Sequence, residues 1–185
     1  MPLDTTLPNI PEDIRKLVAE GKALPPVESW HPTREGAVAI RIARDGQWYF
    51  QGEPMTREAT VHLFSTILRK DGEDYFLVTP AEKQKIEVED VPFVVRLMDV
   101  EDDGLPSQKI HFSTNVGDHF TLSEAHPLIL EQDSKGAPLP YVLVRRNLRA
   151  RLLTPVYYAL ADRAVENPQG QIGIWSGGRF FVLEG

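Results

Sequence analysis

Four arginines lie close together in a chain that is acidic as a whole. The chain has 185 residues and a formal net charge of -7, and the cluster consists of Arg145, Arg146, Arg149 and Arg151. The planar guanidinium group suits paired hydrogen bonds to phosphate or carboxylate. The cluster therefore predicts a local anion site, for which we select Arg145 and Arg146. The alternative is a solvated hairpin face that pairs with the acidic stretch 99–103.

A second group of candidate binding residues follows an apolar run, Tyr75–Thr79, that is typical of a buried strand. Thr79, Glu82 and Lys83 are expected on a short exposed turn, where a rigid scaffold presents binding groups. Arg57, near the start of an expected helix, is a further candidate polar contact. Because turns need polar residues in any case, a purely solvated turn is the alternative.

Aromatic residues offer surfaces on which a flat ligand could stack. Trp30 and His31 lie in a proline-rich segment, whereas Trp48, Tyr49 and Trp175 lie on strands that flank turns. Core packing is the expected role for most of these rings, because aromatic residues on strands usually bury their area against a helix. We assign the stacking role to Trp30 or Trp48.

No complete catalytic or metal-binding motif accompanies these residues. The five histidines form no HExxH pattern, and the absence of cysteine excludes disulfides, thiolate zinc sites and a cysteine nucleophile. Ser176 lacks the G-x-S-x-G spacing of a nucleophile elbow, and neither G-x-x-x-x-G-K-[ST] nor G-x-G-x-x-G occurs. We therefore predict no catalytic residue, no metal ligand and no cofactor.

Composition limits the expected partners and location. The negative net charge argues against general binding to nucleic acids or anionic membranes, which a basic surface would drive. The chain does not open with a basic segment followed by an apolar run, and it has no stretch of 18 uncharged apolar residues. We expect a soluble cytoplasmic protein.

Hydrophobic periodicity and turn residues predict a mixture of helices and many short strands. The expected helices cover residues 11–20, 56–70 and 155–166, and an extended strap covers 24–32. The expected strands cover 38–42, 47–51, 75–79, 85–88, 93–100, 109–114, 119–122, 128–131, 141–145, 148–153, 172–175 and 179–183. Asp45-Gly46 predicts a tight hairpin turn, and Phe64 is expected in the core.

One pattern of elements occurs twice along the chain. The order strand, turn, strand, helix, strand, turn, strand extends over Val38–Val88 and again over Tyr141–Leu183. Because hairpins resemble one another for physical reasons, common descent of the two copies and chance likeness both remain open. We place the domain boundary so that residues 1–84 form the first domain and residues 85–185 the second.

Several segments together resemble the proteobacterial domain-of-unknown-function family 1285. They are Ile40-x-Ile42-Ala43-Arg44-Asp45-Gly46-x-Trp48-Tyr49, Leu63-Phe64-Ser65-x-Ile67-Leu68, Tyr75-Phe76-Leu77-Val78-Thr79-Pro80-x-Glu82-Lys83, Val88-Glu89-Asp90-x-Pro92-Phe93 and Trp175-Ser176-Gly177-Gly178. The resemblance implies two domains with an internally duplicated core, the second superficially like the pleckstrin-homology fold. It also implies a site for a nucleotide-like ligand at the domain interface and a role in signal transduction.

These observations lead to one preferred hypothesis and two alternatives. We predict an α+β protein of two β-rich domains with a duplicated hairpin-helix-hairpin core, the second domain an antiparallel sheet with a helix. Its expected function is that of a non-enzymatic sensor for a small anionic, nucleotide-like ligand. A protein-interaction module with accessible edge strands is the first alternative. A hydrolase of unrecognised type, based on Ser176, the histidines and the carboxylates, is the second.

Overall fold

The computed structural model describes residues 3–4, 6–21 and 23–184, and the chain forms two compact units. Unit 1 extends from Met1 to Asp90 and unit 2 from Val91 to Gly185. The division falls six residues beyond the boundary expected after residue 84. Strand β7 (Glu82–Val88) pairs with two strands of unit 1, and this pairing keeps residues 85–88 in that unit.

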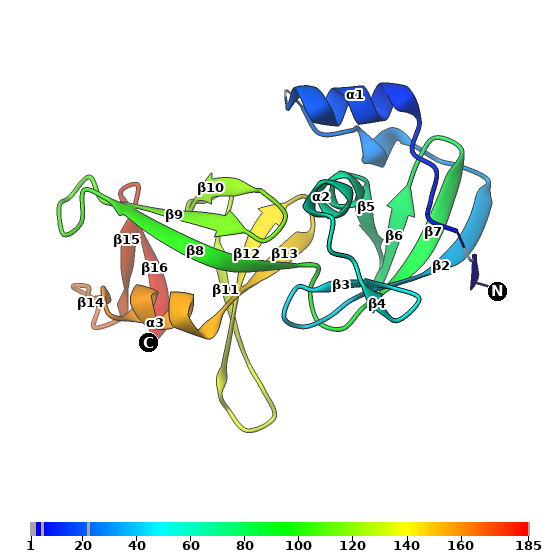
Figure 1. Cartoon of the computed structure of the whole chain (residues 1–185). Coiled ribbons are helices and arrows are strands. Elements are labelled where there is room, and N and C mark those ends of the chain that lie inside the picture. Colours follow the sequence, from blue (N-terminus) through cyan, green and yellow to red (C-terminus); the bar gives the residue numbers. More distant parts are fainter. Residues whose placement is uncertain (1–2, 5, 22, 185) are drawn as a thin grey trace. The chain divides into compact units, whose positions relative to one another are not determined.

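Unit 1 is built on a mixed sheet in which two three-stranded meanders meet (Figure 1). The strands are β1 (Leu3–Asp4), β2 (Arg34–Ile42), β3 (Trp48–Phe50), β4 (Glu53–Pro54), β5 (Leu68–Asp71), β6 (Asp74–Val78) and β7. Their order is β4-β3-β2-β7-β6-β5, with β1 beside β2. The central pair, β2 and β7, is parallel, whereas the meanders themselves are antiparallel.

The hairpin turn predicted at Asp45-Gly46 is confirmed. Gly46 has φ of 89°, a conformation that favours glycine over other residues. The Asp45 side chain accepts a hydrogen bond from the backbone N–H of Gln47 at 3.0 Å. Ile42 and Trp48 then pair across the two strands, so that this turn sets their register.

Helix α2 (Glu58–Thr66) is shorter than the sequence pattern predicts. Phe64 is only 3% exposed, which confirms its expected place in the core. Leu68, expected to continue the helix, instead begins strand β5 opposite Leu77. An apolar residue near a helix end is compatible with both helical and strand periodicity. Here the pairing of Leu68 with β6 makes it a strand residue. Arg57 is the N-cap residue, so the helix begins two residues later than expected.

The segment before the sheet contains helix α1 (Glu12–Glu20) and a short 3₁₀ turn, η1 (Val27–Ser29). Gly21 ends α1 in the left-handed conformation with φ of 65°, directly after the expected helix end at residue 20. The strap after it is fixed to the sheet by Arg69, whose Nη1 donates to the carbonyl oxygens of Val27 and Trp30, each at 2.7 Å.

Unit 2 contains a second large sheet whose strand order repeats that of unit 1. Its strands are β8 (Phe93–Glu101), β9 (Lys109–Thr114), β10 (His119–Thr121), β11 (Leu128–Gln132), β12 (Pro138–Arg145) and β13 (Leu148–Leu152). The order is β10-β9-β8-β13-β12-β11, and β8 and β13 form the parallel central pair. The sheet expected to be antiparallel is therefore mixed, because one parallel pair joins two antiparallel meanders.

The duplicated arrangement is confirmed, but its copies have different bounds from those aligned in the sequence. The strand order matches β2–β7 with β8–β13, hence residues 34–88 with 93–152. Helix α2 lies between the meanders of unit 1, whereas residues 122–127 form a non-helical connection in unit 2. The alignment of Val38–Val88 with Tyr141–Leu183 matched hairpins that occupy different places in the two units.

Helix α3 (Thr154–Ala161) and a small sheet follow the second copy. That sheet has the order β14-β15-β16, with strands β14 (Val165–Glu166), β15 (Ile172–Ser176) and β16 (Arg179–Glu184). Pairing of β14 with β15 ends the helical region well before Asn167, where the sequence pattern placed its end. Among the described residues, no helix combines the length and the hydropathy needed to cross a membrane.

Candidate ligand-binding site

A cavity of about 700 Å³ opens on unit 2. Its wall comes from the β8–β9 loop, the residues after α3, strand β15 and the β15–β16 turn. The lining residues are Asp103, Gly104, Leu105, Pro106, Gln108, Asp162, Arg163, Ala164, Val165, Trp175 and Gly178. A concave site of this size with mostly apolar walls and a few polar groups is typical of small-molecule pockets.

Gln108 holds two walls of the cavity together. Its side chain is buried, with the residue 7% exposed. The Oε1 atom accepts a hydrogen bond from the Gly104 backbone N–H, and Nε2 donates to the Trp175 carbonyl oxygen, each at 2.8 Å. Its own carbonyl accepts from the backbone N–H of Gly177 at 2.9 Å. One side chain thus fixes the β8–β9 loop to strand β15.

The β8–β9 loop has further internal support. The Ser107 hydroxyl donates to the Asp102 carboxylate at 2.8 Å, and the Leu105 N–H donates to the Asp102 carbonyl at 2.9 Å. Asp102 itself has φ of 53°, which is uncommon for a residue with a side chain. These hydrogen bonds stabilise the conformation of the loop. Leu105 within it is nevertheless 56% exposed.

Trp175 supplies the aromatic surface of the cavity. The residue is 41% exposed, and its ring meets that of Phe180 edge-on at 5.1 Å between centroids. The next residue, Ser176, is buried; its hydroxyl donates to the Leu122 carbonyl at 2.7 Å and accepts from the Ile110 N–H at 3.0 Å. Since successive strand residues point to opposite faces, these bonds inside unit 2 turn Trp175 outward.

The charged groups of the cavity are two carboxylates and one guanidinium. Arg163 donates from Nη2 to Asp103 and from Nη1 to the Ala159 carbonyl, both at 3.2 Å. Asp162 is exposed at the C-terminal end of α3. The carbonyl end of a helix carries a partial negative charge. The electrostatic potential at this site is consequently weighted towards negative.

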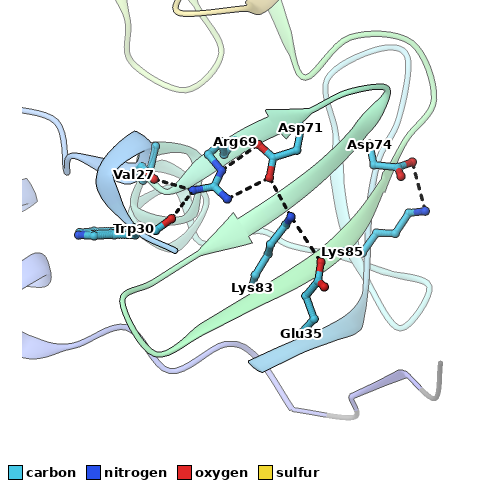
Figure 2. A network of polar contacts seen from close by, with 8 residues as sticks. All are labelled: Val27, Trp30, Glu35, Arg69, Asp71, Asp74, Lys83 and Lys85. Atoms are coloured by element: carbon cyan, nitrogen blue, oxygen red, sulfur yellow. Dashed lines mark hydrogen bonds and ion pairs between the residues drawn. The ribbon is translucent and has the colours of Figure 1, made fainter. Parts of the chain in front are cut away.

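Lys83, one of the site residues expected from the sequence, lies on strand β7 rather than on an exposed turn. Figure 2 shows its ammonium group between Asp71 at 2.8 Å and Glu35 at 3.4 Å. The hydrogen bond to Asp71 raises the pKa of Lys83. Burial alone would raise the pKa of Asp71, but hydrogen bonds from Arg69 and Lys83 outweigh it and lower that pKa. The group is a neutralised network within unit 1.

The neighbours of Lys83 also have structural contacts. Thr79 is buried, and its hydroxyl oxygen accepts hydrogen bonds from the N–H groups of Ala81 and Glu82 at 3.3 and 3.2 Å. Glu82, like Lys83, lies on β7, and its carboxylate accepts from the Gln84 side chain at 3.1 Å. The exposed turn expected here is shorter than predicted, because β7 begins at Glu82 and takes up both charged residues.

The remaining unit 1 candidates differ in exposure. Trp48 is 1% exposed, so its ring belongs to the core and presents no face to a ligand. Trp30 is half-buried in the strap, where its carbonyl binds Arg69. Arg57 is exposed at the start of α2.

In the arginine cluster of unit 2, Arg145 forms an ion pair with Asp118, and its guanidinium lies 4.9 Å from the Phe93 ring centroid. Burial lowers the pKa of Arg145, and Asp118 opposes this effect. Burial also lowers the pKa of Arg146, which follows β12 with φ of 53°. Arg149 pairs with Glu131 at 2.9 Å, so its partner lies on β11 and not in the acidic stretch 99–103.

Sequence reasoning did not find the cavity in unit 2. Its only signals were the apolar pair Leu105-Pro106 inside a polar turn and the placement of Trp175 next to a Gly-Gly turn. The residues that wall the cavity come from three separate stretches of the chain, 103–108, 162–165 and 175–178. Spacing along the sequence does not reveal that Gln108 joins two of these stretches.

The fold and the repeated strand order define a two-domain α+β protein in which each domain is rich in strands. The chain belongs to the DUF1285 family. The model described as "Domain of unknown function (DUF1285), N-terminal domain" matches residues 25–91, and "Protein of unknown function (DUF1285), C-terminal domain" matches residues 92–183.

Two solved structures of this family resemble the chain. A DUF1285 family protein from Silicibacter pomeroyi DSS-3 is 40% identical, with a TM-score of 0.79 over 91% of this chain and 94% of that one. A DUF1285 family protein from Shewanella baltica OS155 is 23% identical, with a TM-score of 0.53 over 68% of this chain and 91% of that one, and it shows the fold alone. No curated protein matches the chain.

Proposed function

We propose that this protein is a non-enzymatic sensor that binds a small molecule in the cavity of unit 2. The observation that carries the proposal is the combination of a cavity of about 700 Å³ with an exposed tryptophan and a wall fixed by Gln108. A preformed wall lowers the entropic cost of binding, because less of the site must be ordered when the ligand arrives.

The lining supports binding rather than reaction. Asp103, Asp162 and Arg163 are the only ionisable residues among the described lining residues, and Arg163 pairs with Asp103. The same part of the chain contributes no serine, threonine, lysine or histidine to the lining. Aspartate can act as a general base, but Asp103 is paired with Arg163, and no hydroxyl, thiol or amine nucleophile lies beside it or Asp162 among the described lining residues.

The sequence and its family resemblance predict an anionic, nucleotide-like ligand with Arg57, Lys83, Arg145 and Arg146 among its contacts, and a role in cytoplasmic signal transduction. We retain this ligand class as the second candidate. Lys83 and Arg145 already pair with carboxylates, so an anion would have to displace Asp71 or Asp118 from them. A ligand that stacks on Trp175 in the cavity of unit 2 does not have to displace a carboxylate from its partner. For this reason the cavity is the first candidate site.

A thermal-shift screen of nucleotides and other metabolites tests the proposal, because a ligand that binds only the native state raises the melting temperature. We expect hits with the wild type that disappear in Trp175→Ala. The matched control is Tyr158→Ala, which removes another exposed aromatic ring, 63% exposed on α3 and outside the lining. Hits should persist in this control. A screen without hits, or hits that Trp175→Ala leaves unchanged, would overturn the cavity as the binding site.

A protein-interaction module remains the alternative function, and one observation favours it. Leu97 on β8 is 65% exposed, and strands β10 and β11 are the edges of the same sheet. Open strand edges suit the addition of a partner strand, and Leu97, on a strand between β9 and β13, offers a separate exposed apolar contact. Loss of partner binding in Leu97→Ser, with melting temperature unchanged, would support this function over the sensor.

A further inference from the structure

We infer that the cavity of unit 2 selects flat aromatic ligands that carry a positive charge and discriminates against anionic ones. This inference deepens the proposed function and rests on it, because it names the chemical class of ligand for the same cavity. It departs from the anionic ligand that the arginine cluster predicts. This selectivity follows from the ring surface, the balance of charge and the C-terminal end of α3.

The preference for a flat ring follows from Trp175. It is the only aromatic residue among the described lining residues, and no other lining side chain offers a planar apolar face of comparable area. Leu105 and Val165, 56% and 47% exposed, add apolar surface around it. A bound ring would remove this exposed apolar area from water and stack on the indole.

The preference for a positive charge follows from the carboxylates. Arg163 has two hydrogen bonds, to Asp103 and to the Ala159 carbonyl, and the pair with Asp103 leaves little net charge. Asp162 remains as an exposed carboxylate. A cation near Asp162 gains Coulomb attraction, whereas an anion is repelled by it.

Two further features act in the same direction. Asp162 ends helix α3, whose carbonyl end adds partial negative charge at this point. A cation can also bind against the face of Trp175, since the ring quadrupole attracts positive charge. Both effects favour a ligand in which the amine is attached close to the ring.

Three compounds with the same ring but different charge provide the test: tryptamine is a cation at pH 7, indole is neutral and indole-3-acetate is an anion. Calorimetric titration of the full chain should give affinities in the order tryptamine, indole, indole-3-acetate. At low salt, we expect tryptamine to bind about tenfold more tightly than indole-3-acetate. This difference should shrink as added salt screens the carboxylate. An indole-3-acetate affinity equal to or above that of tryptamine would overturn the inference.

Variants assign the two preferences to their residues. Asp162→Asn should weaken tryptamine about fivefold and leave indole unchanged, as expected for one partly screened carboxylate. Glu73→Gln, which removes an exposed carboxylate from unit 1, is the matched control and should change neither affinity. Trp175→Ala should abolish binding of all three compounds. Equal loss of tryptamine and indole affinity in Asp162→Asn would refute the charge argument.

The outcomes separate this inference from the proposed function. If none of the three compounds binds at up to about 5 mM, a generous limit for ligands of this size, the inference is overturned. Library hits that depend on Trp175 would then still support the sensor. If the compounds bind equally well to Trp175→Ala, both the inference and the choice of this cavity are wrong.

Discussion

At the scale of single residues, Gln108 is the side chain on which the cavity most depends. Replacing it with leucine removes the acceptor for the Gly104 N–H and the donor to the Trp175 carbonyl. We expect Gln108→Leu to lower the free energy of unfolding by about 1 to 3 kcal/mol, because two partly buried backbone groups lose their partners. Chemical denaturation would measure this loss.

The control for this prediction is Gln132→Leu, which makes the same change at an exposed position on β11. We expect it to change stability by less than about 0.5 kcal/mol. If the two variants are equally stable, Gln108 does not hold the wall as described.

Asp71 carries the predicted pH dependence of unit 1. Its folded pKa lies below the ordinary value of 3.8, so its contribution to stability is present above that pH and is lost as pH falls through the lowered folded pKa. Asp71→Asn should therefore be less stable than the wild type at pH 7, by about 1 to 2 kcal/mol after allowance for partial exposure. The difference should shrink as pH falls below the ordinary carboxyl range.

Asp74→Asn is the matched control for Asp71. Asp74 also forms one ion pair with a lysine, Lys85 at 3.1 Å, but both side chains are half exposed (Figure 2). Denaturation at pH 7 and below pH 3 should show a small, nearly constant effect for this variant, because exposed pairs contribute little. A constant effect for Asp71→Asn as well would mean that its network adds no pH-dependent stability.

The residue types of the candidate sites could be predicted from the sequence, but their partners could not. Lys83 and Arg145 stand out as cations in an acidic chain. Each is neutralised by a residue distant in sequence, Arg145 by Asp118 from 27 positions away. Because hairpin and meander registers decide which charges meet, the availability of a charge to a ligand is settled only in the folded sheet.

At the scale of elements, strand β15 determines where Trp175 lies, and Gly173 allows β15 to pair with β16. A Cβ atom at Gly173 would collide with the Phe181 backbone oxygen and lie 2.8 Å from the Phe180 ring. We expect Gly173→Ala to lower the melting temperature by several degrees and to weaken ligand binding, because a backbone atom cannot move aside as a side chain can.

Gly36→Ala is the control for Gly173→Ala. Its Cβ would also come close to another atom, but that atom is the far end of the flexible Gln84 side chain, 2.6 Å away. A small change in melting temperature is expected, since the Gln84 amide can shift. Differential scanning calorimetry of both variants measures the contrast, and equal changes would contradict the role given to Gly173.

Most elements could be predicted from local patterns, whereas the C-terminal ends of α2 and α3 and the bounds of the repeat could not. The Asp45-Gly46 turn and the strand at Lys109–Thr114 follow from residue types nearby. The end of α2 depends on Leu68 pairing with Leu77, a tertiary contact that overrides helical spacing. The copies of the repeat were misaligned because hairpins in different places of a sheet have similar sequence patterns.

At the scale of the whole molecule, the α+β class and the two β-rich domains could be predicted from the number and length of the expected strands. The parallel pairs β2–β7 and β8–β13 could not be predicted. Each joins the first strand of one meander to the last strand of the next. Antiparallel hairpins leave a local signal in their turns, while a parallel pair formed across a long connection leaves none.

The net charge of the chain also supports the ligand class inferred for unit 2. A formal charge of -7 attracts cations and repels anions at long range, so that the general field and the local carboxylates act together. An anionic ligand would need the opposite local arrangement to overcome this field. The central claim is therefore that the ligand is positively charged and that it contacts Trp175.

The most direct measurement is a titration of the ¹⁵N-labelled chain with tryptamine, followed through the indole N–H signals of its three tryptophans. Trp→Phe variants assign the signals to Trp30, Trp48 and Trp175. We predict that the Trp175 signal moves progressively to saturation, while that of the buried Trp48 stays in place. A Trp175 signal that does not move, at concentrations where calorimetry detects binding, would contradict it.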